Sequence, residues 1–395
     1  MKEIKLGEVL DVKRGTSLSG KFYENSGKYI RLTLGNFTYP ECGWKDNTSK
    51  DDLYYSGDFK NEYLLKKDDI ITPLTEQVRG LLGNTARIPE SDLYIQSGDI
   101  GKIIPFEKLL DKNFAYYLVS SPIVKKQLDA ASQQTKIRHT SPDAIKNCIA
   151  FIPELASQKK IANLLDSLNK KISTNNCIIS ELESLAKTIY DYWFLQFEFP
   201  NEDGKPYKSS GGKMVWNEEL KREIPEKWSV KRYSDITNTT TGKEDANFAT
   251  ENGKYAYFTC GSNILKCDEY KFDGKAILIA GNGDFNVKYY DGKFNAYQRT
   301  YVLMPDEKYI GILYQASKRK IECFKKGSNG SIVKFITKGD IDNIELTIPD
   351  DDKLFDPFNS ILNFIHHNKI ENFKLASLRD FLLPMLMNGQ VTFKD

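Results

Sequence analysis

Residues 157–193 read SQKKIANLLDSLNKKISTNNCIISELESLAKTIYDYW, and this stretch decides the fold. Its apolar residues return at alternating steps of four and three, which is the heptad pattern of a helix with one buried seam. The seam positions are Ile161, Leu165, Leu168, Ile172, Asn175, Ile179, Leu182, Ala186, Ile189 and Trp193. At a rise of 1.5 Å per residue, these ~37 residues predict one helix of roughly 55 Å.

The same seam returns 193 residues later, with polar breaks. Its positions are Leu354, Phe358, Ile361, Ile365, Asn368, Asn372, Leu375, Arg379, Leu382 and Leu386. This second helix is expected to be shorter, because Pro357 fits only a first turn and Pro384 should interrupt the last. We expect the two helices to bury their seams on each other as an antiparallel pair, with Asn175 and Asn368 close together and fixing the register. A parallel pair, or packing of each helix on its own domain, is the alternative.

The segments before the two helices are also related. Gly27-Lys28-Tyr29 with Gly35 recurs as Gly253-Lys254-Tyr255 with Gly261, so the offset falls from 226 residues here to 193 in the helices. Each half shows short β-rich runs, then a helical stretch, and closes on Ile-Pro. The expected strands are 29–34, 70–71, 100–105, 255–259, 276–280 and 299–304, the helical stretches are 113–128 and 309–324, and the closing pairs are Ile152-Pro153 and Ile348-Pro349.

The predicted fold is α+β, with two similar domains separated by a long antiparallel coiled coil in a pseudo-two-fold arrangement. The expected boundaries are 1–153 for the first domain, 154–198 for the first helix, 199–227 for a linker, 228–349 for the second domain and 350–388 for the second helix. A chain of 395 residues with 40% hydrophobic content is large enough for more than one core.

Composition narrows the functional classes. A net charge of +2 neither demands nor excludes nucleic acid. No apolar run approaches a membrane span, and the start of the chain lacks the apolar core of a signal peptide, so we expect a cytoplasmic protein. The six cysteines never form Cys-x-x-Cys and there are three histidines, which predicts reduced structural thiols and no metal site.

Catalytic motifs are missing. The chain has no Pro-Pro, as the Asn/Asp-Pro-Pro-aromatic motif of methyltransferases requires, and no Gly-Lys followed by Ser or Thr, as in a phosphate-binding P-loop. Gly281-Asn282-Gly283 is better explained as a tight turn. We therefore predict a non-catalytic protein without a cofactor of its own.

Recognition remains, and polar side chains that can read base edges lie at matched places in the two halves. The candidates are Gln77, Arg79, Gln133, Gln134, Lys136 and Arg138 in the first half, and Asn282, Asn286, Arg299, Asn329, Ser331 and Lys334 in the second. Two basic clusters could contact phosphates, or could be solvated helix faces. They are Lys125-Lys126 with Lys136, Arg138 and His139, and Lys318-Arg319-Lys320 with Lys325-Lys326.

The chain resembles the specificity subunit of type I restriction-modification systems along its whole length. Several segments carry the resemblance: residues 182–194, Gly204 to Gly212, Leu378 to Gly389, Leu6-Gly7-Glu8-Val9 with Arg14-Gly15-Thr16, and Tyr233-Ser234-Asp235-Ile236 with Thr240-Thr241-Gly242-Lys243. Arg14 and Lys243, in the openings of the two domains, join the candidate DNA contacts.

The resemblance implies two target recognition domains that each read one half of a bipartite DNA site, while the helices set the gap. It also implies partners: double-stranded DNA, two methyltransferase subunits on the helices and two restriction subunits, with S-adenosylmethionine, ATP and Mg²⁺ on those partners. Tyr190, Tyr192 and Phe194 are candidate docking residues, or pack against the adjacent domain. The alternatives are a specificity subunit of another multisubunit restriction-modification type, a recombined phase-variable form, or a two-headed scaffold that binds proteins instead of DNA.

Overall fold

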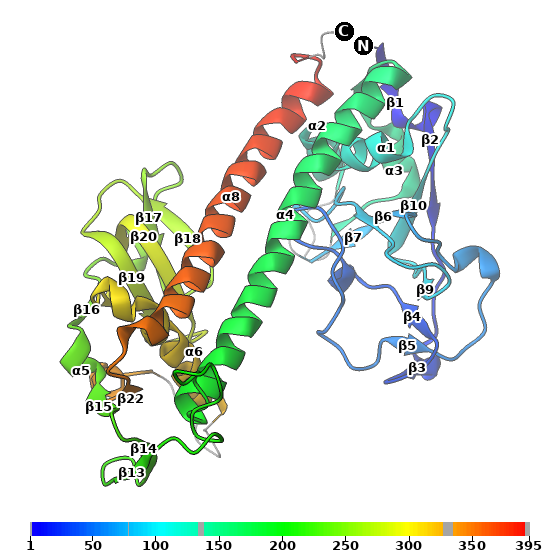
Figure 1. Cartoon of the computed structure of the whole chain (residues 1–395). Coiled ribbons are helices and arrows are strands. Elements are labelled where there is room, and N and C mark those ends of the chain that lie inside the picture. Colours follow the sequence, from blue (N-terminus) through cyan, green and yellow to red (C-terminus); the bar gives the residue numbers. More distant parts are fainter. Residues whose placement is uncertain (1, 78, 133–137, 327–334, 392–395) are drawn as a thin grey trace. The chain divides into compact units, whose positions relative to one another are not determined.

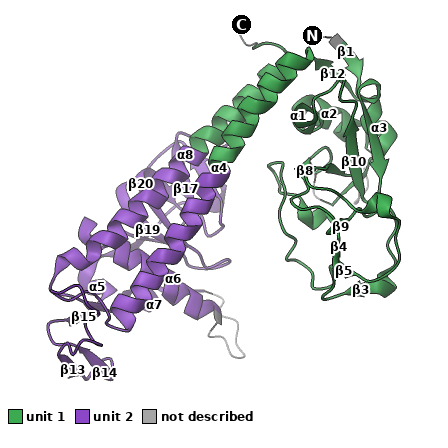
Figure 2. Ribbon diagram, turned by 45° about the vertical axis from the view of Figure 1, so that its right-hand side comes forward, with its two compact units in different colours: residues 1–172, 373–395 green, residues 173–372 purple. Residues whose placement is uncertain are grey.

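The computed structural model describes residues 2–77, 79–132, 138–326 and 335–391 (Figure 1). The chain forms two compact units, which are residues 1–172 with 373–395 (unit 1) and residues 173–372 (unit 2) (Figure 2). Two long helices, α4 (Leu155–Tyr190) and α8 (Asp356–Met387), each contribute residues to both units. Within its described residues the chain has no helix with the length and apolar character needed to cross a membrane.

The two long helices match the heptad prediction closely. Helix α4 has 36 residues and continues into a π-helical turn, Asp191–Leu195, while α8 has 32 residues and is the shorter, as predicted. Pro357 lies in the first turn of α8. The expectation that Pro384 interrupts the helix is wrong, because α8 runs on to Met387. Leu386 and Met387 are buried in the core of unit 1, and this packing holds the last turn beyond the proline.

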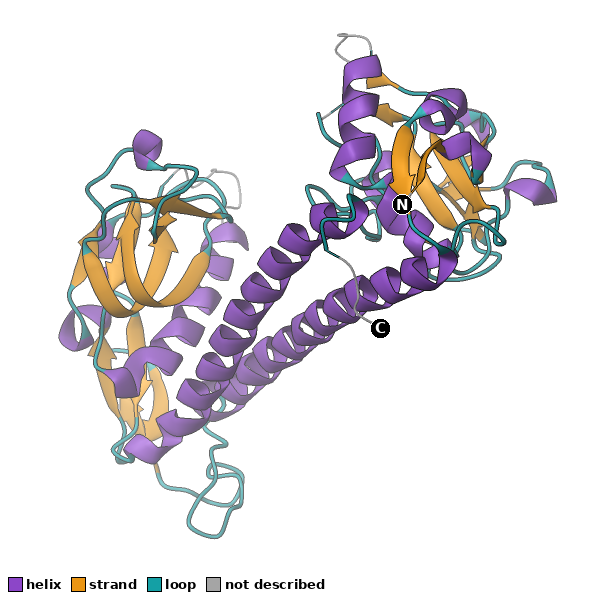
Figure 3. Ribbon diagram, turned by 90° about the horizontal axis from the view of Figure 1, so that it is seen from above, coloured by secondary structure: helices purple, strands orange, loops and turns teal. Residues whose placement is uncertain are grey.

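The two long helices lie side by side (Figure 3), and their contacts show that they are antiparallel within each unit. In unit 2, Ile179 and Ala186 pack with Ile361 and Ile365 in one buried cluster. Tyr190, one turn beyond Ala186, contacts Phe358 edge to face with ring centroids 6.3 Å apart. In unit 1, residues 161–165 of α4 share a core with residues 382–387 of α8. Numbers rise along α4 as they fall along α8, so the predicted antiparallel seam is confirmed.

The polar layer of the seam has a different partner from the one expected. The Nδ2 of Asn175 donates to Asn372 Oδ1 at 2.9 Å and to Glu371 Oε2 at 2.7 Å, whereas Asn368 donates to the carbonyl of Phe364 in its own helix. The predicted proximity of Asn175 and Asn368 is therefore wrong by one turn. Two antiparallel helices alone leave the register undecided to within a turn, and the buried Asn175 selects the amide that can meet it.

Among the residues that the structure describes, unit 1 holds four small sheets. Strand β1 (Lys2–Lys5) pairs antiparallel with β12 (Ile149–Ile152), which brings the opening of the domain to its Ile-Pro close. The largest sheet has the order β2-β10-β6-β8, formed by β2 (Leu10–Arg14), β10 (Ile100–Pro105), β6 (Ile70–Pro73) and β8 (Ala86–Arg87). A second sheet has the order β3-β5-β4-β9, formed by β3 (Tyr23–Glu24), β5 (Tyr54–Tyr55), β4 (Tyr29–Arg31) and β9 (Tyr94–Ile95), and β7 (Thr75–Glu76) pairs with β11 (Arg138–His139).

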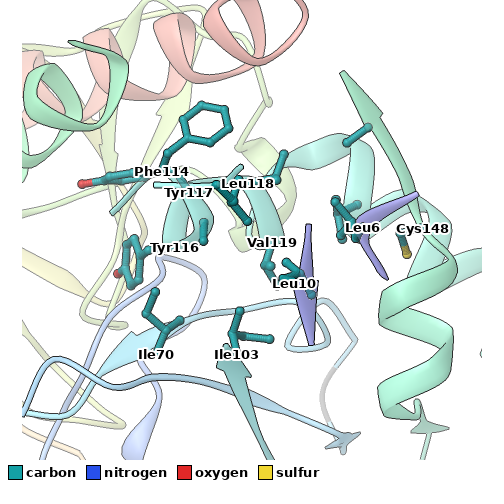
Figure 4. Close-up of a cluster of buried hydrophobic side chains, with 14 of the residues drawn as sticks. Leu6, Leu10, Ile70, Ile103, Phe114, Tyr116, Tyr117, Leu118, Val119 and Cys148 are labelled. Carbon is teal, nitrogen blue, oxygen red and sulfur yellow. The ribbon is translucent and has the colours of Figure 1, made fainter. Parts of the chain in front are cut away.

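Three short helices complete unit 1: α1 (Lys112–Val119), α2 (Pro122–Ala131) and α3 (Pro142–Asn147). The helical stretch expected over 113–128 is confirmed, but it divides into two helices at Ser120 and Ser121 before Pro122. A proline disfavours helical backbone at the residue before it and starts a new helix well. Buried residues of α1, the central sheet and the segment around β1 meet in one core (Figure 4).

Unit 2 has one continuous sheet of six strands in the order β16-β21-β19-β20-β17-β18. These strands are β16 (Thr239–Thr241), β21 (Thr300–Leu303), β19 (Phe272–Ala280), β20 (Val287–Ala296), β17 (Tyr255–Phe258) and β18 (Ile264–Cys267). Here β15 (Ser229–Arg232) pairs with β22 (Glu345–Ile348), as β1 does with β12. The helices are α5 (Tyr233–Ile236), α6 (Ile310–Lys326) and α7 (Lys338–Asp342).

The expected linker is folded and packs on unit 2. Residues 214–225 form a hairpin of β13 (Met214–Asn217) and β14 (Arg222–Pro225). Phe199 stacks between Tyr207 and Trp228, with ring centroids 4.6 and 4.8 Å away. Phe199 and Trp228 therefore belong to the core of unit 2, and Tyr207 packs against it.

The two units repeat one topology. The order β2-β10-β6-β8 in unit 1 matches β16-β21-β19-β20 in unit 2, and all these pairs are antiparallel in both units. The repeated Tyr29 and Tyr255 each begin a strand with one parallel and one antiparallel neighbour. This agreement confirms the internal duplication that the sequence predicts.

Each domain is fixed to the long helices by a polar cluster. In unit 1, Arg87 of β8 forms a bidentate pair with Asp166 of α4 at 3.0 and 3.3 Å, and the Tyr117 hydroxyl donates to the same carboxylate at 2.6 Å. Burial, followed by this hydrogen bond to Asp166, raises the pKa of Tyr117, so the hydroxyl keeps its proton. Asn169 links Tyr117 to Arg379 of α8, each bond at 3.0 Å.

In unit 2 the corresponding role falls to Glu183 of α4. Its carboxylate lies 3.3 Å from Lys318 of α6 and 3.3 Å from Lys369 of α8. Burial works against its charged form, but the two lysines outweigh burial and lower the pKa of Glu183 below its ordinary value. The carboxylate is therefore ionised at neutral pH and joins three helices.

Candidate nucleic-acid interface

Four loop segments of unit 1 meet where β2 and β6 end and β10 begins. The amide of Gly15, just after β2, donates to Ile100 at 3.0 Å, and the amide of Leu74, just after β6, donates to the carbonyl of Asp99 at 2.7 Å. Thr140, just before α3, donates to the carbonyl of Leu74 at 2.8 Å. We call this meeting point the recognition edge, because the sequence candidates of unit 1 lie on the segments that it joins.

Unit 2 builds the same edge with the same bonds. Gly242 after β16 donates to Thr300 at 3.2 Å, and Gly281 after β19 donates to the carbonyl of Arg299 at 2.9 Å. Ile336 before α7 donates to the carbonyl of Gly281 at 2.7 Å. Each of these three backbone hydrogen bonds has a counterpart within unit 1. The bonds therefore identify equivalent residues of the two units independently of their side chains.

A glycine is required at one point of each edge. A β-carbon on Gly15 would overlap the carbonyl oxygen of Ser97, and one on Gly242 would overlap the carbonyl oxygen of Ala296. In both units the chain after the first sheet strand passes directly against the loop that precedes the next strand, so only glycine fits. The two glycines lie in Arg14-Gly15-Thr16 and Thr241-Gly242-Lys243. These segments, near the start of the two domains, carry part of the family resemblance.

Two of the predicted contacts in unit 1 line an open hollow at the recognition edge. Arg14 and Gln77 are exposed and lie on the wall of a hollow of about 630 Å³. Lys50, Ser17 and Asp99, which the sequence did not suggest, line it as well. The wall is polar and carries both donors and acceptors, which suits the edges of bases.

The other two described candidates of unit 1 form ion pairs within the protein. Arg138 is held by Glu76 at 2.8 Å and Asp129 at 2.7 Å, and its side chain is only 14% exposed. Arg79 pairs with the same Asp129 at 2.7 Å but is largely exposed. Hydrogen bonds from Arg79 and then Arg138 lower the pKa of Asp129 to about 2. Because Arg138 is already engaged by two carboxylates of unit 1, its surroundings favour an internal structural role and not a direct contact with a base.

Unit 2 places its described candidates around the equivalent edge. Lys243 and Arg299 are exposed, and Asn282 is half-buried in the turn after β19. Asn286 donates to the carbonyl of Cys260 at 2.8 Å, so its amide is used to shape that loop. Gln133, Gln134, Lys136, Asn329, Ser331 and Lys334 lie outside the described residues.

The basic clusters are partly used for packing. Lys318 pairs with Glu183, and Arg319 pairs with Asp191 at 2.7 Å, so these two residues attach α6 to α4. Lys125 donates to Asn84. Lys126 and Lys325 are exposed on α2 and α6 and remain candidate phosphate contacts.

Two of the three proposed docking aromatics are buried. Tyr190 and Phe194 stack with ring centroids 5.4 Å apart inside the core of unit 2, which favours the packing alternative for both. Tyr192 is 39% exposed. It lies in the π-helical turn after α4, one further step of seven residues from Ile178 and Leu185, two exposed apolar residues of α4.

No group of three or more His, Cys, Asp and Glu side chains that could hold a metal ion occurs among the residues the structure describes. The six cysteines are free thiols. Burial raises the pKa of the Cys148 thiol to about 11, so this cysteine stays protonated in its core.

Comparison with known proteins places this architecture. The family model for the type I restriction modification DNA specificity domain matches residues 1–184 and 225–372. The specificity subunit of the type I restriction enzyme EcoDI of Escherichia coli is 32% identical over 176 residues, which are 43% of this chain and 40% of that relative. The MjaIX specificity subunit of Methanocaldococcus jannaschii is 23% identical over 352 residues, which are 80% of this chain and 79% of that relative.

Among solved structures, the crystal structure of a type I restriction-modification system S subunit from M. genitalium has the same fold. It aligns with a TM-score of 0.62 at 18% identity and covers 98% of this chain and 96% of its own. The chain spans about two fifths of the length of the EcoDI relative, and more of the MjaIX relative and of the M. genitalium chain. The family model covers both domains with their duplicated recognition edges, and the chain belongs to the type I restriction modification DNA specificity domain family.

Proposed function

We propose that this chain is the DNA-specificity subunit of a type I restriction-modification complex, in which each recognition edge reads one half of a bipartite, gapped DNA site. The observation that carries the proposal is the duplicated edge in a chain whose two domains both match the specificity-domain family. Duplication gives two readers, and their different loop residues suit two different half-sites. The antiparallel seam of α4 and α8 would then set the number of base pairs in the gap.

The proposed partners carry the chemistry. Two methyltransferase subunits would dock on the long helices, and two restriction subunits would join them to cut DNA. S-adenosylmethionine, ATP and Mg²⁺ would bind those subunits, and this chain would act without catalysis or a cofactor of its own. DNA would be the ligand that the recognition edges contact directly.

The exposed line of Ile178, Leu185 and Tyr192 supports docking on α4. These residues are 41%, 49% and 39% exposed, and steps of seven place them at one repeated heptad position that borders the seam. An apolar stripe outside the seam suits a second helix from a partner. Tyr192 is the member of the predicted docking set that is available for this contact.

Methylation mapping tests the proposal. The chain is expressed with the methyltransferase subunit of its own system in a host without type I modification, and N6-methyladenine is mapped by single-molecule sequencing. We expect one gapped two-part motif, absent when this chain is omitted. An identical methylome with and without the chain would contradict the proposed function.

Docking is tested separately by Leu185→Glu. Placing a charge in the apolar stripe should abolish co-purification of the methyltransferase subunit. The matched control is Ser180→Glu, because Ser180 is exposed on another side of α4. Equal loss in both variants would contradict the stripe as the docking surface.

A further inference from the structure

The two recognition edges carry opposite charges at one equivalent backbone position. Asp99 and Arg299 each provide the carbonyl that accepts a hydrogen bond from the first residue after the neighbouring strand, Leu74 in unit 1 and Gly281 in unit 2. Each is also the third residue of a tight turn. Ile100 closes the first turn and Thr300 the second, with amide-to-carbonyl distances of 3.0 and 2.8 Å.

The backbone at both residues is held by two hydrogen bonds, one in the turn and one to the neighbouring segment. Asp99 and Arg299 are exposed, and in the described part of the chain neither side chain forms a hydrogen bond or an ion pair. Each charged side chain therefore projects to solvent from a turn whose backbone is fixed by hydrogen bonds, which is the support that a ligand-contacting residue needs. Asp99 also lines the hollow on whose wall Arg14 and Gln77 lie.

The charge at Asp99 decides which part of DNA it can meet. A carboxylate is repelled by phosphates, but it accepts hydrogen bonds from the amino groups that bases present in the major groove, above all cytosine N4. Arginine in the equivalent place donates two hydrogen bonds to O6 and N7 of guanine. The same scaffold position would therefore read opposite members of a base pair in the two half-sites.

We propose that Asp99 and Arg299 are specificity-determining residues, Asp99 for an amino-bearing base in the half-site read by unit 1 and Arg299 for a guanine in the half-site read by unit 2. This inference rests on the proposed function. It goes beyond it by assigning one residue and one class of base to each edge. Asp99 was not among the candidates from the sequence, because an acidic residue does not suggest DNA contact until its place on the edge is known.

The test uses the assembled complex of this chain with its methyltransferase subunit. The motif of the unchanged complex is mapped first, and then those of Asp99→Asn and Arg299→Gln. We expect Asp99→Asn to lower the preference at one base pair of the first half-site by roughly tenfold to a hundredfold, with the second half-site and the gap unchanged. Arg299→Gln should lower the preference at one base pair of the second half-site, with the first half-site and the gap unchanged.

Matched controls lie at the opposite ends of the same sheets. Glu90→Gln follows β8 and Lys271→Gln precedes β19, both are exposed, and neither should alter the motif. Circular dichroism of each variant verifies that it is folded.

Three outcomes are distinguishable. Absence of any gapped motif with the unchanged complex would contradict the proposed function itself. A normal motif that neither substitution alters would overturn the inference alone. An even loss of methylation at all sites with Arg299→Gln would identify a phosphate contact, and would overturn base reading by Arg299.

Discussion

The two units build equivalent recognition edges, but the outer strands of their sheets differ. In unit 2, the ten-residue strand β20 pairs with β19 on one side and β17 on the other. In unit 1 the same place is shared by β8 and β9, two strands of two residues with residues 88–93 between them. The connection after the repeated tyrosine strand also differs, with residues 32–53 between β4 and β5 but only residues 259–263 between β17 and β18.

This difference shows which parts of the domain are fixed and which can vary. The backbone bonds at the edge, the glycine crossing and the pairing of the opening strand with the closing strand are the same in both units. Outer strands and loops differ in length and composition. Loop residues can therefore change while the scaffold that positions them stays the same.

The crossing glycines give the strongest test of this equivalence. Gly15→Ala and Gly242→Ala should each lower the free energy of unfolding by about 3 kcal/mol or more, because a β-carbon would overlap a backbone carbonyl that has no room to move. Urea denaturation measures the effect. Gly339→Ala is the control, because a β-carbon there meets only ordinary contacts. Tolerance of alanine at one crossing and not at the other would break the equivalence.

The polar clusters should differ in strength. Asp166→Ala leaves Arg87 without its bidentate partner and removes the acceptor of the Tyr117 hydroxyl, so we expect a loss of about 2–3 kcal/mol. Glu183→Ala breaks two single contacts to flexible lysines, and we expect about 1 kcal/mol. Thermal and urea unfolding of both variants checks the order. A larger loss at Glu183 would reverse this part of the comparison.

The polar layer of the seam occurs in unit 2 through Asn175 and Asn372. Replacing both with leucine should raise the free energy of unfolding by about 1 kcal/mol, because the buried amide of Asn175 and the half-buried amide of Asn372 give way to apolar contact. Asn368→Leu, outside this contact, serves as the control and should change stability less. A fall in stability of the double variant would show that the amide pair contributes more than register.

The exposed lysines should give the smallest effects. Lys126→Ala in unit 1 and Lys325→Ala in unit 2 should weaken DNA binding of the assembled complex about equally for all sequences and reduce its salt slope by about 1. Binding titrations over a range of salt concentrations check this. A change confined to one half-site would instead indicate base contact.

The sequence predicted the parts of the fold that repeat or have a strong period. The heptad seam, its antiparallel pairing and the duplicated domains are confirmed, because periodic apolar spacing states directly which face of a helix is buried. The sequence could not predict details that depend on contacts between residues far apart in the chain. Met387 holds the helix past Pro384 through burial, and Asn175 meets Asn372 through register, and neither is local information.

The candidate site was predicted at the level of loops and less well at the level of residues. The described candidates lie on the segments of the recognition edges, but residue type alone could not separate free side chains from occupied ones. Arg138 serves internal ion pairs, while Asp99 is exposed at the edge and has no side-chain partner among the described residues. Charge suggests affinity for DNA, whereas only the fold shows whether that charge is already satisfied.

The division of the long helices between the units has a consequence for synthesis on the ribosome. Unit 2 consists of consecutive residues, 173–372, so it can complete its core as soon as they emerge. Unit 1 needs residues 382–387 beside Ile161 and Leu165, so the domain that is made first is finished last. During translation the nascent first domain must wait for a helix half that is some two hundred residues away, so part of its core stays open until the end of the chain has been made.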